Sequence, residues 1–168
     1  MPFNLLKKYN QLLELAGFDE LKRELSLKGV FNRDIVNNPN FIFRGKRILP
    51  TPDSGVIKME TLFKHLTTVI VDKNTRKREF DLYRSLRLHW VKFHIEEQKT
   101  ENMLIFSVKE PEGVRTYIYD KDEKYVIILE PLRNKNEYYL LTAYYLSGKD
   151  SKRDKIVKKY NRRLDNIL

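Results

Sequence analysis

Four apolar segments between residues 103 and 146 restrict the fold more than any other feature of the sequence. They read MLIFSV, VRTYIY, YVIIL and EYYLLTAYYL, and the connections between them are PEG, DKDEK and RNKN. β-Branched and aromatic residues favour strands, and short polar connections join consecutive antiparallel strands. The region therefore predicts a four-stranded antiparallel sheet.

Polar and aromatic side chains recur at alternate positions in two of these strands. Since successive side chains of a strand point to opposite faces, Arg115, Tyr117 and Tyr119 should share one face of the second strand. One face of the last strand should carry four residues at alternate positions: Tyr138, Leu140, Thr142 and Tyr144. We therefore expect arginine, threonine and tyrosine side chains to converge on one surface of the sheet.

Apolar residues at helical spacing predict helices before this sheet. The spacing from Leu5 to Ala16 predicts a helix that ends near Gly17, and Asp19 is placed to cap a second, short helix. The segment from Met59 to Leu66 predicts a further helix, with a short strand at residues 69–71. Residues 37–55 contain three prolines and two glycines, which indicates an irregular connection.

Residues 80–90 read FDLYRSLRLHW and predict a helix that leads into the sheet. Its apolar face carries Leu82, Leu86 and Trp90, which follow one another at intervals of four residues. Its other faces carry Arg84, Arg87 and His89. This helix therefore brings basic side chains next to the strands.

The segment after Gly148 predicts a basic amphipathic helix. Ile156, Tyr160 and Leu164 form one apolar stripe, and Asp150 or Ser151 is a suitable cap. The exposed positions carry eight basic and three acidic residues, so their net charge is +5, half of the +10 of the whole chain. This is the strongest electrostatic signal in the sequence.

These elements together indicate an α+β fold. Its order is N-terminal helices with an irregular segment, then a helix, a four-stranded antiparallel sheet and a C-terminal basic helix. The chain has 168 residues, which suits one domain with an extension. We divide it into a helical and irregular extension over residues 1–56 and a domain over residues 57–168.

The charge balance points to a polyanionic partner. There are 33 Lys and Arg residues against 23 Asp and Glu residues, and such an excess favours nucleic acid or an anionic lipid surface. No cysteine is present, which excludes disulfides, thiolate zinc sites and a cysteine nucleophile, and fits a reducing compartment. Lysines interrupt the leucine-rich N-terminus, so no membrane span or signal peptide is expected. We expect a cytoplasmic RNA-binding protein without a membrane partner.

Several enzyme classes lack their motifs in this sequence. There is no GxxxxGK[ST] loop and no GxGxxG turn, and HIEE at residues 94–97 is not HExxH. Acidic residues show no arrangement typical of a Mg²⁺ site. We therefore expect neither a metal nor a cofactor.

Cleavage of RNA without a metal requires a base, an acid and cations near the phosphate. The three histidines are His65, His89 and His94, and His89 is our first choice because it stands in the arginine-bearing segment. Arg115 suits a phosphate, and Thr142 and Tyr144 can donate hydrogen bonds or take part in proton transfer. Tyrosine and threonine are also good strand formers, so these residues can simply serve packing. A surface that combines basic and aromatic groups can also bind unpaired bases without catalysis.

The segments FDLYRSLRLHWVKFHIEE, RTYIY, YVIIL, YYLLTAYYL and GKDSKRDKIVKKYNRRL together resemble a known family. This part of the chain, from Phe80 to the C-terminus, resembles phage-associated nuclease domains of the barnase/EndoU/colicin/RelE superfamily. The resemblance implies a helix followed by a four-stranded antiparallel sheet. It also implies a metal-independent endoribonuclease with a role as a toxin or in phage conflict, and an acidic inhibitor or antitoxin as a further partner.

Carried over by position, the resemblance implies a site on the sheet near the end of the preceding helix. The catalytic set comprises His89, Arg115, Thr142 and Tyr144. The set that binds nucleic acid comprises Arg84, Arg87, Lys92, Lys149 and Lys152. The alternative is a non-catalytic RNA-binding or phage-structural protein that keeps the sheet and the basic helix.

Overall fold

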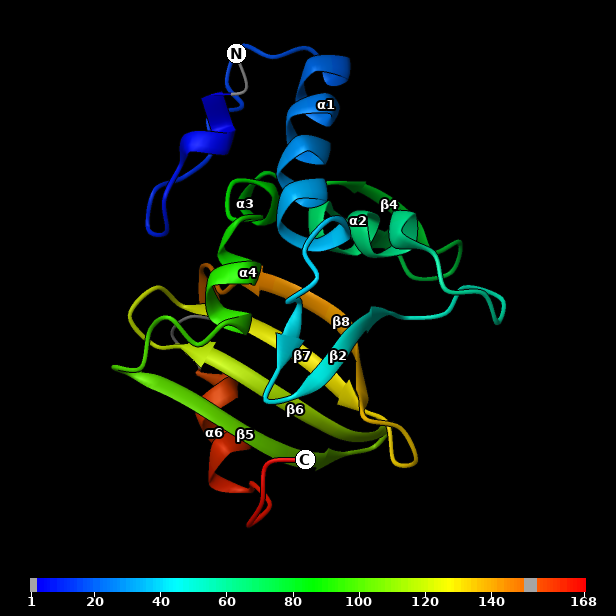
Figure 1. Ribbon diagram of the computed structural model, residues 1–168, viewed down its shortest axis with the longest axis vertical. Helices are drawn as coiled ribbons and strands as arrows, with labels where there is room; N and C mark the ends of the chain where they lie inside the picture. The colour runs from blue at the N-terminus through cyan, green and yellow to red at the C-terminus, as the bar shows by residue number, and fades with distance from the viewer. Residues whose placement is uncertain (1–2, 150–153) are drawn as a thin grey trace.

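The structure is a computed structural model, and it describes residues 3–149 and 154–168. The fold is α+β, with a large sheet in the order β1-β2-β8-β7-β6-β5 and a separate two-stranded sheet of β3 and β4. Figure 1 shows α1 to α4 on one side of the large sheet, and α6 next to β5 on the other side. Both faces of this sheet are therefore covered.

The four strands predicted for the C-terminal half are all present. They are β5 (Met103–Glu110), β6 (Gly113–Asp120), β7 (Tyr125–Pro131) and β8 (Glu137–Tyr145), and each pairs antiparallel with the next. Turns at residues 111–112 and 121–124 connect the first three of these strands. The local pattern of alternating side chains and short polar turns is sufficient to specify this meander.

The prediction of a four-stranded sheet is wrong, because two further strands come from residues 37–55. β1 (Ile42–Phe43) pairs antiparallel with β2 (Lys46–Pro50), and β2 runs parallel to β8 with Ile48 opposite Tyr138. This segment was predicted to be irregular because of its prolines and glycines. It becomes extended because its backbone groups find partners on the edge of β8.

The helix after Asp19 is longer than the short one predicted, and the helix predicted from Met59 to Leu66 is present. α1 (Glu20–Phe31) continues into a π-helical turn (Asn32–Val36), and α2 (Met59–Thr67) runs directly into β3 (Thr68–Asp72). β4 (Lys77–Phe80), α3 (Leu82–Ser85) and α4 (Trp90–Ile95) follow. The Asp19 carboxylate accepts a hydrogen bond from the Lys22 amide, which confirms the predicted cap of α1.

The predicted helix ending near Gly17 is wrong. A short 3₁₀ helix (Phe3–Leu6) is the helical part of this segment, and the backbone of Glu14 is held by the side chain of Asn4. Leu13 and Leu15 are both buried, and the Leu13 amide donates to the carbonyl of Leu86. Contacts with the rest of the molecule therefore replace the hydrogen bonds that a local helix would make.

Two other helix predictions are corrected in length. The predicted helix at residues 80–90 is divided, because Phe80 ends β4 and a turn separates α3 from α4. The C-terminal helix α6 extends over Lys155–Asn161, and residues 162–168 leave the helix and pass along β5, where the Leu164 amide donates to the Ser107 carbonyl. Asp154 caps α6, whereas the caps we predicted, Asp150 and Ser151, lie outside the described residues.

Two apolar cores lie on the two faces of the large sheet. The larger core joins Leu27 and Val30 of α1 and Leu62 and Leu66 of α2 to sheet residues such as Ile127. The smaller core places Ile156 of α6 against Phe106, Tyr117 and Val126, among others. Both the sheet and the larger core include residues from 1–56 and from 57–168, so apolar packing crosses the position of our predicted domain boundary.

Candidate functional site

A β-bulge in β8 determines on which face of the sheet each of its side chains lies. Ile128 pairs with Thr142, whereas the next residue, Leu129, pairs with Leu140, so Leu141 is the extra residue. Residues before and after such a bulge change faces relative to strict alternation. Leu140 and Tyr138 therefore belong to the larger core, while Tyr144 packs against the smaller one. The prediction of one shared face for these residues is wrong.

Arg84 lies at the part of β8 that β2 does not cover. The pairing with β2 ends at Leu140, and Arg84 of α3 reaches the strand just beyond this point. Its Nη1 lies 3.1 Å from Thr142 Oγ1, 3.0 Å from the His65 carbonyl oxygen and 3.2 Å from the Thr68 carbonyl oxygen. The guanidinium also lies 5.4 Å from the ring centroid of Tyr144. The structure thus brings together three predicted site residues: Arg84, Thr142 and Tyr144.

Arg78 of β4 bonds to Thr68, as Arg84 does. Its Nε and Nη2 donate to the hydroxyl and carbonyl oxygens of Thr68 at 2.8 and 3.0 Å. Within the described part of the chain, the side-chain hydrogen bonds of Arg78 and Arg84 all go to neutral oxygens, and neither guanidinium has a carboxylate partner. Burial lowers the pKa of Arg78, and the nearby charges of Arg84 and Arg76 lower it further. The two arginines therefore repel each other, and Asp81 is a carboxylate whose charge acts in the opposite direction on Arg84.

A hollow of about 520 Å³ opens beside Arg78, and we call it the cationic hollow. Arg84 is not one of its lining residues, but it donates to the carbonyl of His65, which is. Its basic lining residues are Lys64, His65, Arg76 and Arg78, and Asp53 is the one carboxylate among the described residues that line it. Thr51, Ser54 and Thr61 add hydroxyl groups. Such a lining favours an anion with several oxygen acceptors.

His65 is the titratable group of the cationic hollow that is suited to proton transfer. Burial lowers its pKa below the usual value, and the charges of Arg78 and Arg84 lower it further, while the backbone of Leu141 and the carboxylate of Asp53 act in the opposite direction. The imidazole is therefore neutral at pH 7. Its Nδ1 is buried and finds no hydrogen-bond partner among the described residues, while other atoms of the residue line the hollow.

Arg115 lies across β8 from this group, in a second hollow of about 360 Å³ that also includes Thr142, Tyr117 and Lys159. We call it the α6 hollow. Arg115 forms an ion pair with Glu130, with 3.0 Å between Nη1 and Oε2. Arg115 and Thr142 thus line one hollow as predicted, but Arg115 already has a carboxylate partner.

His89 and Arg87 do not join this group. The Nε2 of His89 lies 3.1 Å from the Lys8 carbonyl oxygen, and only 5% of the residue is exposed. Burial lowers the pKa of His89. The guanidinium of Arg87 stacks at 3.9 Å over the ring of Tyr145 and donates to the Tyr83 carbonyl. Both side chains hold the N-terminal segment and α3 against the core.

The remaining predicted binding residues are dispersed. Lys92 forms an ion pair with Glu96 on α4, 3.5 Å apart. Lys149 is exposed beyond the end of β8, and Lys152 lies outside the described residues. Neither Lys92 nor Lys149 lines the cationic hollow.

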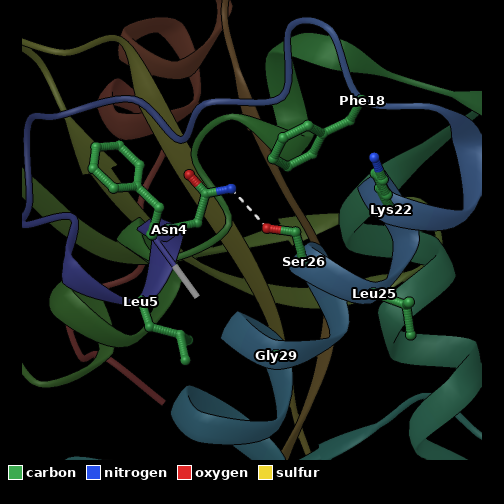
Figure 2. A pocket seen from close by; sticks show the side chains of 8 residues that line it. Asn4, Leu5, Phe18, Lys22, Leu25, Ser26 and Gly29 are labelled. Carbon is green, nitrogen blue, oxygen red and sulfur yellow. Dashed lines mark hydrogen bonds between the residues drawn. The ribbon is translucent and has the colours of Figure 1, made fainter. Parts of the chain in front are cut away.

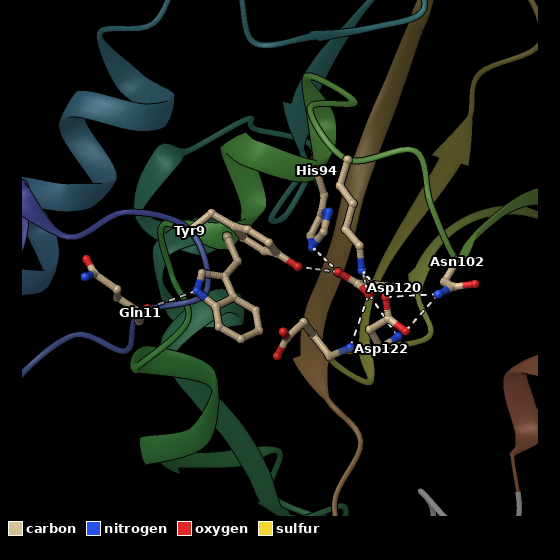
Figure 3. Close-up of polar contacts among 9 residues, drawn as sticks. Tyr9, Gln11, His94, Asn102, Asp120 and Asp122 are labelled. Atoms are coloured by element: carbon tan, nitrogen blue, oxygen red, sulfur yellow. Dashed lines mark hydrogen bonds and ion pairs between the residues drawn. The ribbon is translucent and has the colours of Figure 1, made fainter.

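His94 lies in a polar cluster that holds the N-terminal segment on the sheet (Figure 3). The buried carboxylate of Asp120 accepts a hydrogen bond from the Tyr9 hydroxyl and one of 2.5 Å from Lys99. His94 Nε2 lies 3.3 Å from the same carboxylate, and the Tyr9 ring stacks on Phe93. Both His94 and Asp120 are inaccessible to solvent, so the cluster is placed to stabilise the fold.

Another hollow lies between the N-terminal turn and α1 (Figure 2). It measures about 450 Å³ and is lined mainly by apolar groups such as Phe3, Phe18 and Leu25. The side chain of Asn4 donates to Ser26 Oγ across it at 2.7 Å. Lys22 is its one ionisable side chain among the described lining residues, so this hollow offers little for acid–base chemistry.

Within residues 3–149 and 154–168, no three His, Asp or Glu side chains are placed to share a metal ion. In the same residues, no helix is both long enough and apolar enough to cross a membrane. Comparisons with protein-family models, curated proteins and solved structures find no match for this chain.

Sequence reasoning missed two of the residues that define the cationic hollow. Arg78 belongs to the charged run DKNTRKRE, and the position of this run between two short strands was a usable signal for a basic hairpin. His65 had no such signal, because it stands in an ordinary amphipathic helix. Only the packing of α2 against β8 brings its ring to the arginines.

Proposed function

We propose that this protein binds RNA at the cationic hollow and cleaves it without a metal ion. The observation that carries the proposal is the pair Arg78 and Arg84, which have no carboxylate partner among the described residues and lie beside a neutral histidine. The net charge of +10 supports a polyanionic substrate. The site differs from the predicted one in its histidine, since His65 takes the place of His89.

Arg84 supplies a specific phosphate contact. Its Nη1 is occupied by oxygens of the protein, whereas Nε and Nη2 make no hydrogen bond with the described residues. These two nitrogens form one edge of the planar guanidinium, which matches two oxygens of a phosphate. Arg78 adds a second positive charge near the same phosphate.

His65 acts as the base in this proposal. Its neutral imidazole removes the proton of a ribose 2′-hydroxyl, and the 2′-oxygen attacks the adjacent phosphorus. The bond from phosphorus to the 5′-oxygen breaks, and that oxygen takes a proton from the Tyr144 hydroxyl. Arg78 and Arg84 stabilise the charge that develops on the phosphorane oxygens. The products are a 2′,3′-cyclic phosphate end and a 5′-hydroxyl end.

The test of cleavage uses purified protein, single-stranded RNA and excess EDTA, with analysis of the product ends. We expect cyclic phosphate ends, and we expect His65→Gln to lower the rate by about 100-fold or more, as is typical for loss of a general base. His89→Gln is the matched control: it should lower the melting temperature and leave the rate per folded molecule unchanged. Equal rates for His65→Gln and the native protein would exclude His65 as the base.

Phosphate binding is tested separately by RNA affinity at several salt concentrations. Arg76→Met and Arg78→Met should weaken binding and reduce its salt dependence, because each removes one charge from the hollow. Arg47→Met is the control, since its exposed side chain lies outside the hollow. Absence of salt-dependent binding would contradict the proposed function.

A second candidate is RNA binding without cleavage. It is favoured by the scarcity of proton donors in the cationic hollow, whose described lining contains a single carboxylic acid, Asp53, and no second histidine. RNA that binds tightly and stays intact in the cleavage test would support this candidate. The toxin role and the acidic inhibitor remain predictions from the family resemblance.

A further inference from the structure

The α6 hollow adjoins the cationic hollow through the bulge in β8. Leu141 and Thr142 line the α6 hollow, and Thr142 Oγ1 also accepts the hydrogen bond from Arg84. The backbone of Leu141 lies next to His65. Residues 141 and 142 of β8 therefore lie next to groups of both hollows.

The two hollows differ in charge. In the α6 hollow, Arg115 is paired with Glu130, and Lys159 is paired with Glu110. Burial opposes ionisation of Glu110, but hydrogen bonds from Lys159 and Tyr117 outweigh it and lower its pKa. The cations of this hollow are therefore already neutralised, and it offers no excess positive charge to a phosphate.

The lining of the α6 hollow combines apolar walls with donors and acceptors. Ile128 and Leu141 supply apolar surface, Arg115 supplies N–H donors, and the carboxylate of Glu112 at the rim supplies acceptors. Glu112 is exposed and forms no ion pair with the described residues. A flat heteroaromatic ring with donors and acceptors on its edge matches this combination better than an anion does.

We propose that the α6 hollow receives one nucleobase of an RNA strand whose neighbouring phosphate is bound by Arg84 and Arg78. This inference rests on the proposed function. The strand passes around the edge of β8 beyond Leu140, where the pairing with β2 ends. A base inside a duplex is stacked and paired, so it cannot enter a hollow of this kind. The substrate class is therefore unpaired RNA, in single strands or loops.

The test uses a short, labelled 2′-O-methyl oligonucleotide, which has no free 2′-hydroxyl and stays intact. In a series of otherwise identical oligonucleotides, one position at a time carries no base. Loss of the base at one position should weaken binding by about tenfold or more, as loss of a bound base does in other single-strand sites. The other positions and a fully paired duplex of the same sequence provide the comparison, and the duplex should bind more weakly than the single strand.

Two variants connect this effect to the α6 hollow. Ile128→Phe fills the hollow, so it should weaken binding of the intact oligonucleotide. It should also remove the difference in affinity between the intact and the abasic oligonucleotides. Glu112→Trp at the rim serves the same purpose without changing a buried residue. Val71→Phe is the matched control, because Val71 is exposed on β3 and lines neither hollow. Melting temperatures verify that each variant is folded.

The outcomes separate this inference from the proposed function. If binding depends on salt and on Arg78 but no single base matters, the base hollow is wrong and the phosphate site stands. A duplex that binds as tightly as the single strand would likewise show that the base hollow is wrong and leave the phosphate site standing. If the oligonucleotide does not bind, or Arg78→Met has no effect, the proposed function itself is overturned.

Discussion

The three histidines show how burial determines what a residue can do. Burial lowers the pKa of His65, His89 and His94, and it is the largest effect in each case. Only His65 lines a hollow with cationic neighbours, whereas His89 and His94 are enclosed by the N-terminal segment. The same lowering of the pKa therefore occurs in a histidine that lines a hollow and in two that are enclosed by packing.

Arg78 should influence the acid limb of the proposed cleavage reaction through His65. Because the charge of Arg78 lowers the pKa of His65, Arg78→Met should raise this pKa towards its usual value of about 6.5. Proton NMR of the imidazole measures the change directly, and the acid limb of cleavage should move to higher pH with it. Arg47→Met is expected to leave both unchanged. A His65 titration that is the same in the native protein and in Arg78→Met would contradict the prediction.

Tyr9→Phe should destabilise the fold by about 2 kcal/mol, because it removes a hydrogen-bond donor from the buried carboxylate of Asp120. Urea unfolding measures the loss. Tyr83→Phe is the control, since that ring is exposed and its change should cost far less. Equal stability of Tyr9→Phe and the native protein would show that the hydrogen bond from the Tyr9 hydroxyl to Asp120 does not stabilise the fold.

At the scale of elements, sequence pattern predicted what is encoded locally. β5 to β8 were found because alternation and turns lie within the strands themselves, and α2 because its apolar stripe is complete over nine residues. β2 was missed because its partner, β8, lies about ninety residues further along the chain. The bulge at Leu141 was missed for a related reason: it arises from pairing with β7 and has no distinctive residue.

The candidate site was predictable to a similar extent. Arg84, Thr142 and Tyr144 were chosen from their elements, and the structure places them together. His65 and Arg78 were not chosen, because the site is assembled from α2, the β3–β4 hairpin and the edge of β8. The choice of His89 followed from its neighbours in sequence. In the fold these neighbours lie on different faces of a divided helix.

The role of β2 as an integral strand can be tested in the core. Ile48→Ala should lower the free energy of unfolding by about 2–4 kcal/mol, because the side chain is buried against the larger core. Ile42→Ala, in the neighbouring strand β1, should have a small effect because Ile42 is exposed. Equal losses in urea unfolding, or no loss at Ile48, would show that β2 is not part of the folded core.

At the scale of the whole molecule, the three histidines make stability depend on pH. Their folded pKa values lie below the unfolded value of about 6.5, so the folded protein excludes protons that the unfolded chain binds. Stability should therefore be complete above this pH and fall below it, by up to about 1.4 kcal/mol per pH unit for each histidine. Asp120, with a pKa lowered by Lys99 and Tyr9 against the effect of burial, should extend the loss below about pH 4.

Urea unfolding at pH 7.5 and pH 5.5 measures this dependence. The variant His94→Gln should reduce the difference between the two pH values, because one proton-binding group is removed from the unfolded chain. A free energy of unfolding that rises from pH 7.5 to pH 5.5 would contradict the prediction. Lys92→Gln provides a control at a half-buried position on the same helix.

The position of β2 between β1 and β8 has a consequence for synthesis on the ribosome. β2 is complete at residue 50, but its partner strand begins at residue 137, and the partner of Tyr9 is Asp120. Long-range pairings form late, and unpaired strand edges exposed in the meantime promote aggregation. The apolar residues Ile48 and Leu49 of β2 therefore stay without their partner strand until most of the chain has emerged. We expect its yield in cells to depend on translation speed and on chaperones that bind extended apolar segments.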